Sequence, residues 1–182
     1  MASALQAMSV VAPTFSKLVD HATQILRVEV TASSSRWDST SSGKVIDTYV
    51  QCSIERTLKG ATASSITLRF LGGSVGDDHM EAPGMPVLQV GQSYVLFIAK
   101  NGDAFCPIVA GAHGSYPISL DASTKAQTVL RANLQPLVSI SAVSDPMQGS
   151  AASLGQAAVG PGLSLAAFED SILSEVTRES AH

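Results

Sequence analysis

One stretch with a period of two constrains the fold of this chain more than any other feature. Apolar and polar residues alternate over positions 46–55 and again over 66–70. Alternation at every second residue is typical of a strand with one face buried and the other in water. Lys59-Gly60 lies between the two segments, and Gly72-Gly73 follows the second. Because glycine allows tight turns, the stretch 44–73 predicts two strands joined as a hairpin.

Further segments have the length and apolar content of strands. The pattern predicts strands over 25–31, 93–100, 104–110 and 114–120, and a short strand or helical turn over 127–132. The almost continuous apolar run 93–100 is expected to be a buried central strand. Asn101-Gly102 after it is a strong hairpin signal, and Pro107 predicts an edge or a bulge. The polar segments 32–43 and 74–89 are predicted to be surface loops.

Two amphipathic helices are expected to flank these strands. Thr14 would cap a short N-terminal helix, and Ser164 would cap a C-terminal helix over 163–179. The apolar stripe of the C-terminal helix consists of Leu165, Phe168, Ile172 and Val176, and its expected water-facing residues are Glu169, Asp170, Glu175 and Arg178. An exposed stripe of this size favours association, so we expect the helix to dock on the strands of its own chain. Binding to another protein is the alternative.

These elements predict a mainly β protein. A small, strongly twisted set of strands closes into a barrel or packs as a sandwich. We expect a partly open, five- to six-stranded OB-like barrel with a short N-terminal helix and a C-terminal amphipathic helix. The expected division is an unstructured start or processing remnant over 1–12, a barrel domain over 13–138, an Ala/Ser/Gly-rich linker over 139–162 and the helix over 163–182.

Composition narrows the class of partner and the compartment. Only 14% of the 182 residues are charged, against about 25% in typical globular proteins. The net charge is −4 and the basic residues are scattered, so binding to nucleic acid or to an anionic membrane surface is not expected. No apolar run approaches the roughly 18 residues that span a bilayer. A low-charge, Ser/Thr-rich composition is common in secreted bacterial proteins, which predicts a secreted, periplasmic or cell-surface protein.

The first residues of the chain do not have the pattern of a signal peptide. Residues 1–12 lack a positively charged segment and a continuous apolar stretch. We expect that a signal peptide is absent from this sequence and that the natural precursor is longer.

The two cysteines, Cys52 and Cys106, each lie in a predicted strand. Neither has a neighbouring cysteine, which argues against a metal site. They are either two buried free thiols or one disulfide between distant strands. We favour the disulfide because of the secreted-type composition. It would stabilise the fold by about 4 kcal/mol in the chain-entropy model.

The strongest polar cluster in the sequence is Asp77, Asp78, His79 and Glu81. Carboxylates and an imidazole could hold a divalent ion, but the spacing matches no calcium loop, and a solvated acidic loop is the alternative. The nucleophile motif G-x-S-x-G is absent. The glycine-rich segment 72–76 does not open a predicted helix, as a phosphate-binding loop would. No catalytic residue and no cofactor are therefore expected.

Four other residues are candidates for a binding surface: Trp37, Tyr49, Arg69 and His113. Trp37 is the only tryptophan and lies in the predicted loop 32–43, where it either closes a barrel end or contacts a ligand. Tyr49 and Arg69 would lie on the exposed face of the predicted hairpin. His113 lies close to two glycines and is expected at a turn or at the rim of the core.

Five phrases carry a resemblance to a known group of proteins. They are TFSKLVDHATQILRVEVTASSSRW, VQCSIERTLKG, ITLRFLGGSVGD, VGQSYVLFI and FCPIVAGAHGSYPI, which together span about Thr14 to Ile118. In this order they resemble a widespread family of uncharacterised secreted bacterial proteins, which has no established activity. The layout is also loosely similar to the netrin-like barrels of tissue metalloproteinase inhibitors. Those inhibitors place an N-terminal cysteine on the catalytic zinc, and this chain has no cysteine near its start, so the same mechanism is not expected.

Taken together, the sequence predicts a secreted, non-enzymatic binding module for a protein or a cell-envelope component. Two alternatives remain: an inhibitor of a secreted protease, and a hydrolase that uses the acidic loop 77–81. Association into an oligomer through the C-terminal helix is also open at this point.

Overall fold

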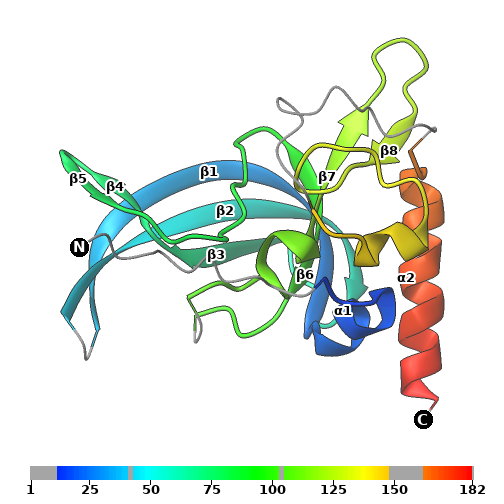
Figure 1. Cartoon of the computed structure of the whole chain (residues 1–182), viewed down its shortest axis with the longest axis horizontal. Helices are drawn as coiled ribbons and strands as arrows, with labels where there is room; N and C mark the ends of the chain where they lie inside the picture. Colours follow the sequence, from blue (N-terminus) through cyan, green and yellow to red (C-terminus); the bar gives the residue numbers. More distant parts are fainter. Residues whose placement is uncertain (1–11, 41–42, 103–104, 148–161, 182) are drawn as a thin grey trace.

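The computed structural model describes residues 12–40, 43–102, 105–147 and 162–181. Within these ranges the chain is mainly β, as predicted, with an antiparallel six-stranded sheet in the order β3-β2-β1-β6-β7-β8 and a separate hairpin β4-β5 (Figure 1). The strands are β1 (Gln24–Thr40), β2 (Gly43–Lys59), β3 (Ser65–Leu71), β4 (Gly73–Val75), β5 (Asp78–Met80), β6 (Ser93–Ile98), β7 (Ser115–Leu120) and β8 (Gln127–Val129). The helices are α1 (Phe15–His21), α2 (Leu165–Ser180) and the short 3₁₀ helices η1 (Gly111–Gly114) and η2 (Ile140–Ser144).

The predicted hairpin of β2 and β3 is confirmed, but the longest hairpin of the protein is β1–β2. Each of these strands has 17 residues, and they pair from Ile25 opposite Lys59 to Thr40 opposite Gly43. The expected loop over 32–43 is therefore wrong for residues 32–40, which belong to β1, and for Gly43, which begins β2. The segment is rich in serine and threonine, so its sequence has no alternation of apolar and polar residues. Its backbone nevertheless pairs with β2. An irregularity at Thr31 shifts the alternation of β1 by one residue.

β6 is buried on both faces and separates two apolar cores, as its continuous apolar run predicted. One face carries Val95 and Phe97 into a core beneath the helices, which we call the helix-side core. The other carries Tyr94, Leu96 and Ile98 into a second core beneath the loops that follow β5 and β6, which we call the loop-side core. The loop-side core also contains Leu26, Val28, Val50, Cys52, Leu68, Phe70, Leu88 and Ile108.

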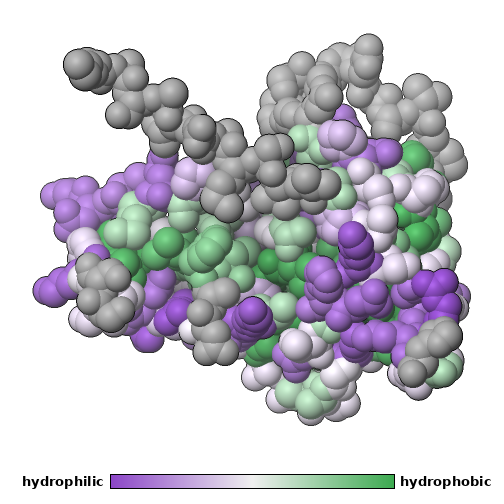
Figure 2. Space-filling model, turned by 60° about the horizontal axis from the view of Figure 1, so that its bottom comes forward, coloured by the Kyte–Doolittle hydropathy of each residue, from purple (hydrophilic) through white to green (hydrophobic). Residues whose placement is uncertain are grey.

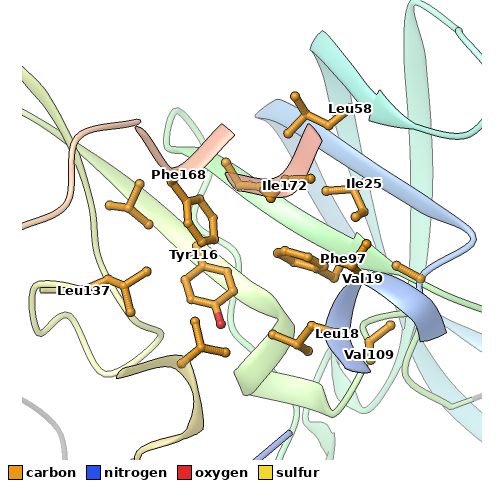
Figure 3. Close-up of a cluster of buried hydrophobic side chains, with 14 of the residues drawn as sticks. Leu18, Val19, Ile25, Leu58, Phe97, Val109, Tyr116, Leu137, Phe168 and Ile172 are labelled. Atoms are coloured by element: carbon orange, nitrogen blue, oxygen red, sulfur yellow. The ribbon is translucent and has the colours of Figure 1, made fainter. Parts of the chain in front are cut away.

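Both helices begin where the sequence predicted. The hydroxyl of Thr14 accepts a hydrogen bond from the Lys17 N–H (3.3 Å), and Ser164 accepts one from the Ala167 N–H (3.2 Å). The expectation that α2 docks on its own sheet is confirmed. The ring of Phe168 lies 5.0 Å from that of Tyr116 and 6.3 Å from that of Phe97, and Figure 3 shows these rings converging in the helix-side core.

One residue of α2 departs from the expected pattern. Glu169 was predicted to face water, but only 2% of it is exposed. Its carboxylate accepts a hydrogen bond from Nη1 of Arg27 on β1 (3.0 Å) and another from Nη1 of Arg56 on β2. Arg27 also forms an ion pair with Glu55 (2.9 Å). Two guanidinium groups thus balance the charges of the Glu55 and Glu169 carboxylates. This balance allows the charged Glu169 to be buried between the helix and the sheet.

The sheet is not closed into a barrel, but its β3 edge is covered. Asn101 accepts a hydrogen bond from the Arg69 N–H (3.3 Å) and donates one to the Thr67 carbonyl (2.8 Å). The Leu71 N–H donates to the Phe105 carbonyl (2.8 Å). Within the predicted return strand 104–110, the described residues 105–110 form a bridge between Ile98 and Ile108 and no longer strand, because Pro107 lacks a backbone donor.

The segment expected as a linker begins inside the folded unit. Ala142 and Val143 of η2 are buried in the helix-side core. The remainder of that segment, 148–161, and the expected start 1–11 lie outside the described residues. Among the described helices, none combines the length and the apolarity needed to cross a membrane.

Candidate functional site

The strand register divides the four predicted surface residues. Tyr49 on β2 lies opposite Arg69 on β3, so their side chains share one face of the sheet. Trp37 lies opposite Ile46 on β2. Ile46 alternates with Val50 and Cys52 of the loop-side core, and Tyr49 points to the opposite face. Trp37 therefore lies on the loop-side face. His113 lies elsewhere, in η1. The four residues do not form one surface, because the shift at Thr31 reverses the faces of the distal half of β1.

Around Tyr49 the side chains form a compensated polar cluster. The guanidinium of Arg36 stacks 3.9 Å from the centre of the Tyr49 ring. The Tyr49 hydroxyl donates a hydrogen bond to Asp38, and this bond lowers the pKa of Asp38. Asp47 is buried beside them, which raises its pKa, while Arg69 lies 3.9 Å from its carboxylate. The cluster orders the end of the β1–β2 hairpin and contains no nucleophile beside a base.

The acidic segment occupies the β4–β5 hairpin. Nδ1 of His79 lies 2.8 Å from the Ser74 hydroxyl, and its Nε2 lies 3.5 Å from the carboxylate of Glu81. The side chains of His79 and Glu81 are largely exposed. In the described part of the chain no three His, Cys, Asp or Glu side chains gather in a way that could hold a metal ion. No such group is found at Asp77, Asp78, His79 and Glu81, and Asp78 and His79, which are neighbours in β5, point to opposite faces.

The predicted disulfide is wrong in this structure. Cys52 and Cys106 are free thiols, and Cys106 instead lies 3.7 Å from the Ile108 carbonyl. Burial raises the pKa of Cys52 to about 11 and raises that of Cys106 as well. A thiol that stays protonated is a poor nucleophile. The two residues pack as small apolar side chains at the loop-side core.

His113 is half-buried and stays neutral near pH 7. Burial and the nearby charge of Arg131 both lower its pKa. The guanidinium of Arg131 is itself buried and donates to the Asp145 carbonyl. This position at the rim of the core agrees with the structural role predicted for His113.

The most distinctive surface feature is an apolar groove that the sequence did not reveal. It encloses about 380 Å³ between the loop after β5, strand β7 and the turn after β8. Its apolar walls include Met85, Pro86, Val87, Pro117, Leu130 and Leu134. A second hollow of about 270 Å³ lies on the other side of the segment 85–87, against β2 and β3. Figure 2 shows apolar side chains gathered on one face and bordered by hydrophilic ones.

Two of the groove residues expose apolar side chains to an unusual degree. Val87 is 82% exposed and Leu134 is 56% exposed. Leu134 also has a φ of 65°, a left-handed conformation that costs a non-glycine residue about 1–2 kcal/mol. A turn holds it there, in which the Leu134 N–H donates to the Arg131 carbonyl (2.8 Å). Strained and exposed apolar residues of this kind concentrate at binding sites.

The groove also offers a polar group for hydrogen bonding. The side chain of Gln92 is already engaged, because its amide donates to the Ile118 carbonyl (2.6 Å). Gln89 is exposed, and its backbone N–H donates to the Tyr94 hydroxyl (2.9 Å). Among the described residues, the Gln89 side-chain amide has no hydrogen-bond partner. Apolar walls with a few polar groups are typical of pockets that bind a ligand.

Sequence reasoning missed this groove because its walls come from three segments that meet only in the folded chain. The signals that were present are Val87 in the polar loop and the apolar Leu134 after β8. No protein-family model matches the chain, and no curated protein matches it in sequence. The case for this site therefore rests on its geometry alone.

Proposed function

We propose that this protein is a non-enzymatic binding module that holds an apolar segment of another protein in the groove beside Val87 and Leu134. The single observation that carries the proposal is the groove itself, with two exposed apolar side chains and the amide of Gln89. An extended peptide would place one or two apolar side chains between the walls, while the amide of Gln89 would bond its backbone. A protein partner suits this mixture better than a charged envelope polymer, because the groove walls carry no charged side chain.

The experiment is selection of a displayed random peptide library on the immobilised full-length protein. We expect the recovered peptides to carry aliphatic or aromatic anchors. Their affinity should fall at least tenfold on the double variant Val87→Asn/Leu134→Asn. Asparagine removes the apolar surface and tolerates the left-handed conformation at position 134. The matched control is Leu120→Asn, since Leu120 is 57% exposed and lies outside the groove.

Two results would reject the groove as the site. One is that no peptide is enriched over the uncoated surface. The other is that the groove variant and the Leu120→Asn control bind the recovered peptides equally well.

Inhibition of a secreted protease is the second candidate, and one observation favours it. Val87 follows Pro86 in an exposed loop, which is a shape that an extended protease site can accept. Incubation with an elastase-like protease, which accepts small aliphatic residues, tests this. Inhibition that Val87→Asp abolishes would support it, and unchanged protease activity would exclude it for this class.

The OB-like character of the sheet and the secreted location of the protein are also proposals. The hydrogen bonds that link the β3 edge to Asn101 and Phe105 support a partly open, OB-like barrel. Free thiols remove the disulfide argument for an oxidising compartment. A secreted or periplasmic location and membership of the resembled bacterial family now rest on the sequence phrases and on the low charge content.

A further inference from the structure

The distal half of β1 is an open sheet edge. β1 pairs with β6 only over Gln24–Glu29, and the last bonds on that side join Val30 to Gln92 (3.1 Å) and to Gly91 (2.8 Å). From Ala32 onward the strand pairs with β2 alone. In Figure 1 this half of β1 forms the outer rim of the sheet.

The pairing of β2 shows which backbone groups of this edge point outward. The Ile46 carbonyl accepts from the Gly72 N–H beside β3, so Asp47, the next residue, points towards β1. Asp47 lies opposite Arg36. Arg36 therefore bonds to β2, and the residues that alternate with it present N–H and C=O groups away from the sheet: Ser33, Ser35, Trp37 and Ser39.

In the described chain no backbone hydrogen bond reaches these outward groups, although Gly73 of the β4–β5 hairpin packs against the side chain of Ser35. The hairpin β4–β5 lies nearby, but within the described chain β4 pairs only with β5. A row of free donors and acceptors is a template for another strand. Lysine and proline are two of the residues that protect such an edge, and residues 32–40 contain neither; their charged residues are Arg36 and Asp38. Trp37, 43% exposed, adds apolar area at the centre of the edge.

We propose that two copies of this chain associate through this edge as an antiparallel pair, with Trp37 opposite the second copy's Trp37. The charges select this register. The two charged residues of the edge are Arg36 and Asp38, and the twofold arrangement places Arg36 of each copy opposite Asp38 of the other. A shift to either neighbouring register would place Arg36 opposite Arg36, or Asp38 opposite Asp38. The charge pattern therefore fits a second copy of this chain in one register.

The pairing would join two six-stranded sheets into one continuous sheet. Both tryptophans would lie on its loop-side face, because directly opposite residues of a pair share a face. The contact is a short strand pair with few large side chains, and interfaces below about 1,200 Å² are weak. We therefore expect a dimer that forms at about 10–100 μM protein.

Sedimentation of the full-length chain over a concentration series is the first test. The wild-type protein should shift from monomer to dimer. Either single reversal, Arg36→Asp or Asp38→Arg, should weaken the dimer at least tenfold, because like charges then face each other twice. The double variant Arg36→Asp/Asp38→Arg restores opposite charges across the interface and should recover the dimer. Thermal melting of each variant checks that it is folded.

Cross-linking tests the register without relying on charge. In the proposed pair the two copies of position 37 lie opposite each other at a Cα separation of about 5.5 Å, which suits a disulfide. Trp37→Cys should therefore form a linked dimer on mild oxidation. Ser39→Cys is the matched control, because its two copies would lie about 13 Å apart.

Three results would overturn the proposal: a monomer at every concentration, a dimer that neither charge reversal weakens, or a Ser39→Cys link as efficient as the Trp37→Cys link. The second would place the interface elsewhere, and the third would establish a different register.

Discussion

At the scale of single residues, the position of one carboxylate determines how α2 meets the sheet. Glu169 lies four residues after Leu165 and three before Ile172, so the helical period places it on the buried face. Its two partners, Arg27 and Arg56, come from β1 and β2. The ion pairs thus fix the position of the helix along the sheet, and the neighbouring apolar residues supply the buried area.

Neutralising this carboxylate should destabilise the protein. Glu169→Gln keeps the shape of the side chain and leaves two guanidinium groups with one fewer counter-charge. Breaking a buried pair costs about 3–5 kcal/mol, but Arg27 and Arg56 are partly exposed and can reach water. We expect a loss of about 2 kcal/mol in the free energy of unfolding, measured by urea denaturation. Asp170→Asn, on the exposed face, is the control and should change it by less than about 0.5 kcal/mol.

The raised pKa of the buried Cys52 thiol should make the protein less stable in alkaline solution. Burial raises the pKa of Cys52 from 9.0 to about 11 in the folded chain, so the unfolded chain releases this proton first. The contribution of Cys52 to the free energy of unfolding should therefore be constant below about pH 9 and fall as the pH rises towards 11. Urea denaturation at several pH values measures this, and Cys52→Ala should show a shallower decline.

A thiol count provides the accompanying check on the free cysteines. Two thiols should react with Ellman's reagent in denaturant without any reductant. A count of zero before reduction would restore the disulfide and refute this account.

At the scale of elements, the two ends of the described chain are held together by aromatic rings. Phe168 of α2 is fully buried, and its ring lies 6.1 Å from that of Phe15 at the start of α1. Phe97 of β6 and Tyr116 of β7 complete the group. The C-terminal helix is therefore part of the core of the described chain.

Removing the Phe168 ring should show how far the stability of the protein depends on the packing of α2. Phe168→Ala leaves a cavity in the helix-side core and should lower the free energy of unfolding by about 3–5 kcal/mol. Ser174→Ala, on the exposed side of the same helix, should have little effect. Thermal melting compares the two variants, and an unchanged melting temperature for Phe168→Ala would mean that α2 does not contribute to the core in solution.

At the scale of the whole molecule, the sheet has an edge that is covered and an edge that is open. The β3 edge is covered by a side chain, since Asn101 bonds to β3 through both its oxygen and its nitrogen. The carbonyl of Gly102 also accepts from Arg69 (2.6 Å). The distal β1 edge has no such cover among the described residues. The same sheet thus has hydrogen-bonded cover along β3 and, among the described residues, unpaired backbone groups along the distal half of β1.

Hydrogen exchange at the backbone amide of Arg69 tests whether Asn101 protects the β3 edge. Asn101→Ala removes the acceptor of the Arg69 N–H, so hydrogen exchange at this amide should become faster. Exchange at the Val50 amide, inside the paired part of β2, should not change. The site is exposed to water, so we expect a loss of only about 0.5–1 kcal/mol in stability. Equal exchange rates for Arg69 in the two proteins would show that the loop does not hold this edge.

The sequence by itself determined the elements whose patterns are local. Alternation identified β2 and β3, length and apolar content identified β6 and β7, and the side-chain caps identified the starts of both helices, because these signals depend only on neighbouring residues. The buried position of β6 followed from its continuous apolar run. The same patterns showed that the class is mainly β.

Only the tertiary structure decided the features that depend on residues far apart in the chain. The extension of β1 through 32–40 required β2 as a partner, and the irregularity at Thr31 placed Trp37 and Tyr49 on opposite faces. The thiols stayed free because each packs singly at the loop-side core. The groove needed three segments to meet, and the burial of Glu169 needed two arginines from different strands. The helical period alone places Glu169 beside the apolar stripe, but its partners, like the other features, are set by which segments become neighbours when the apolar surface is buried.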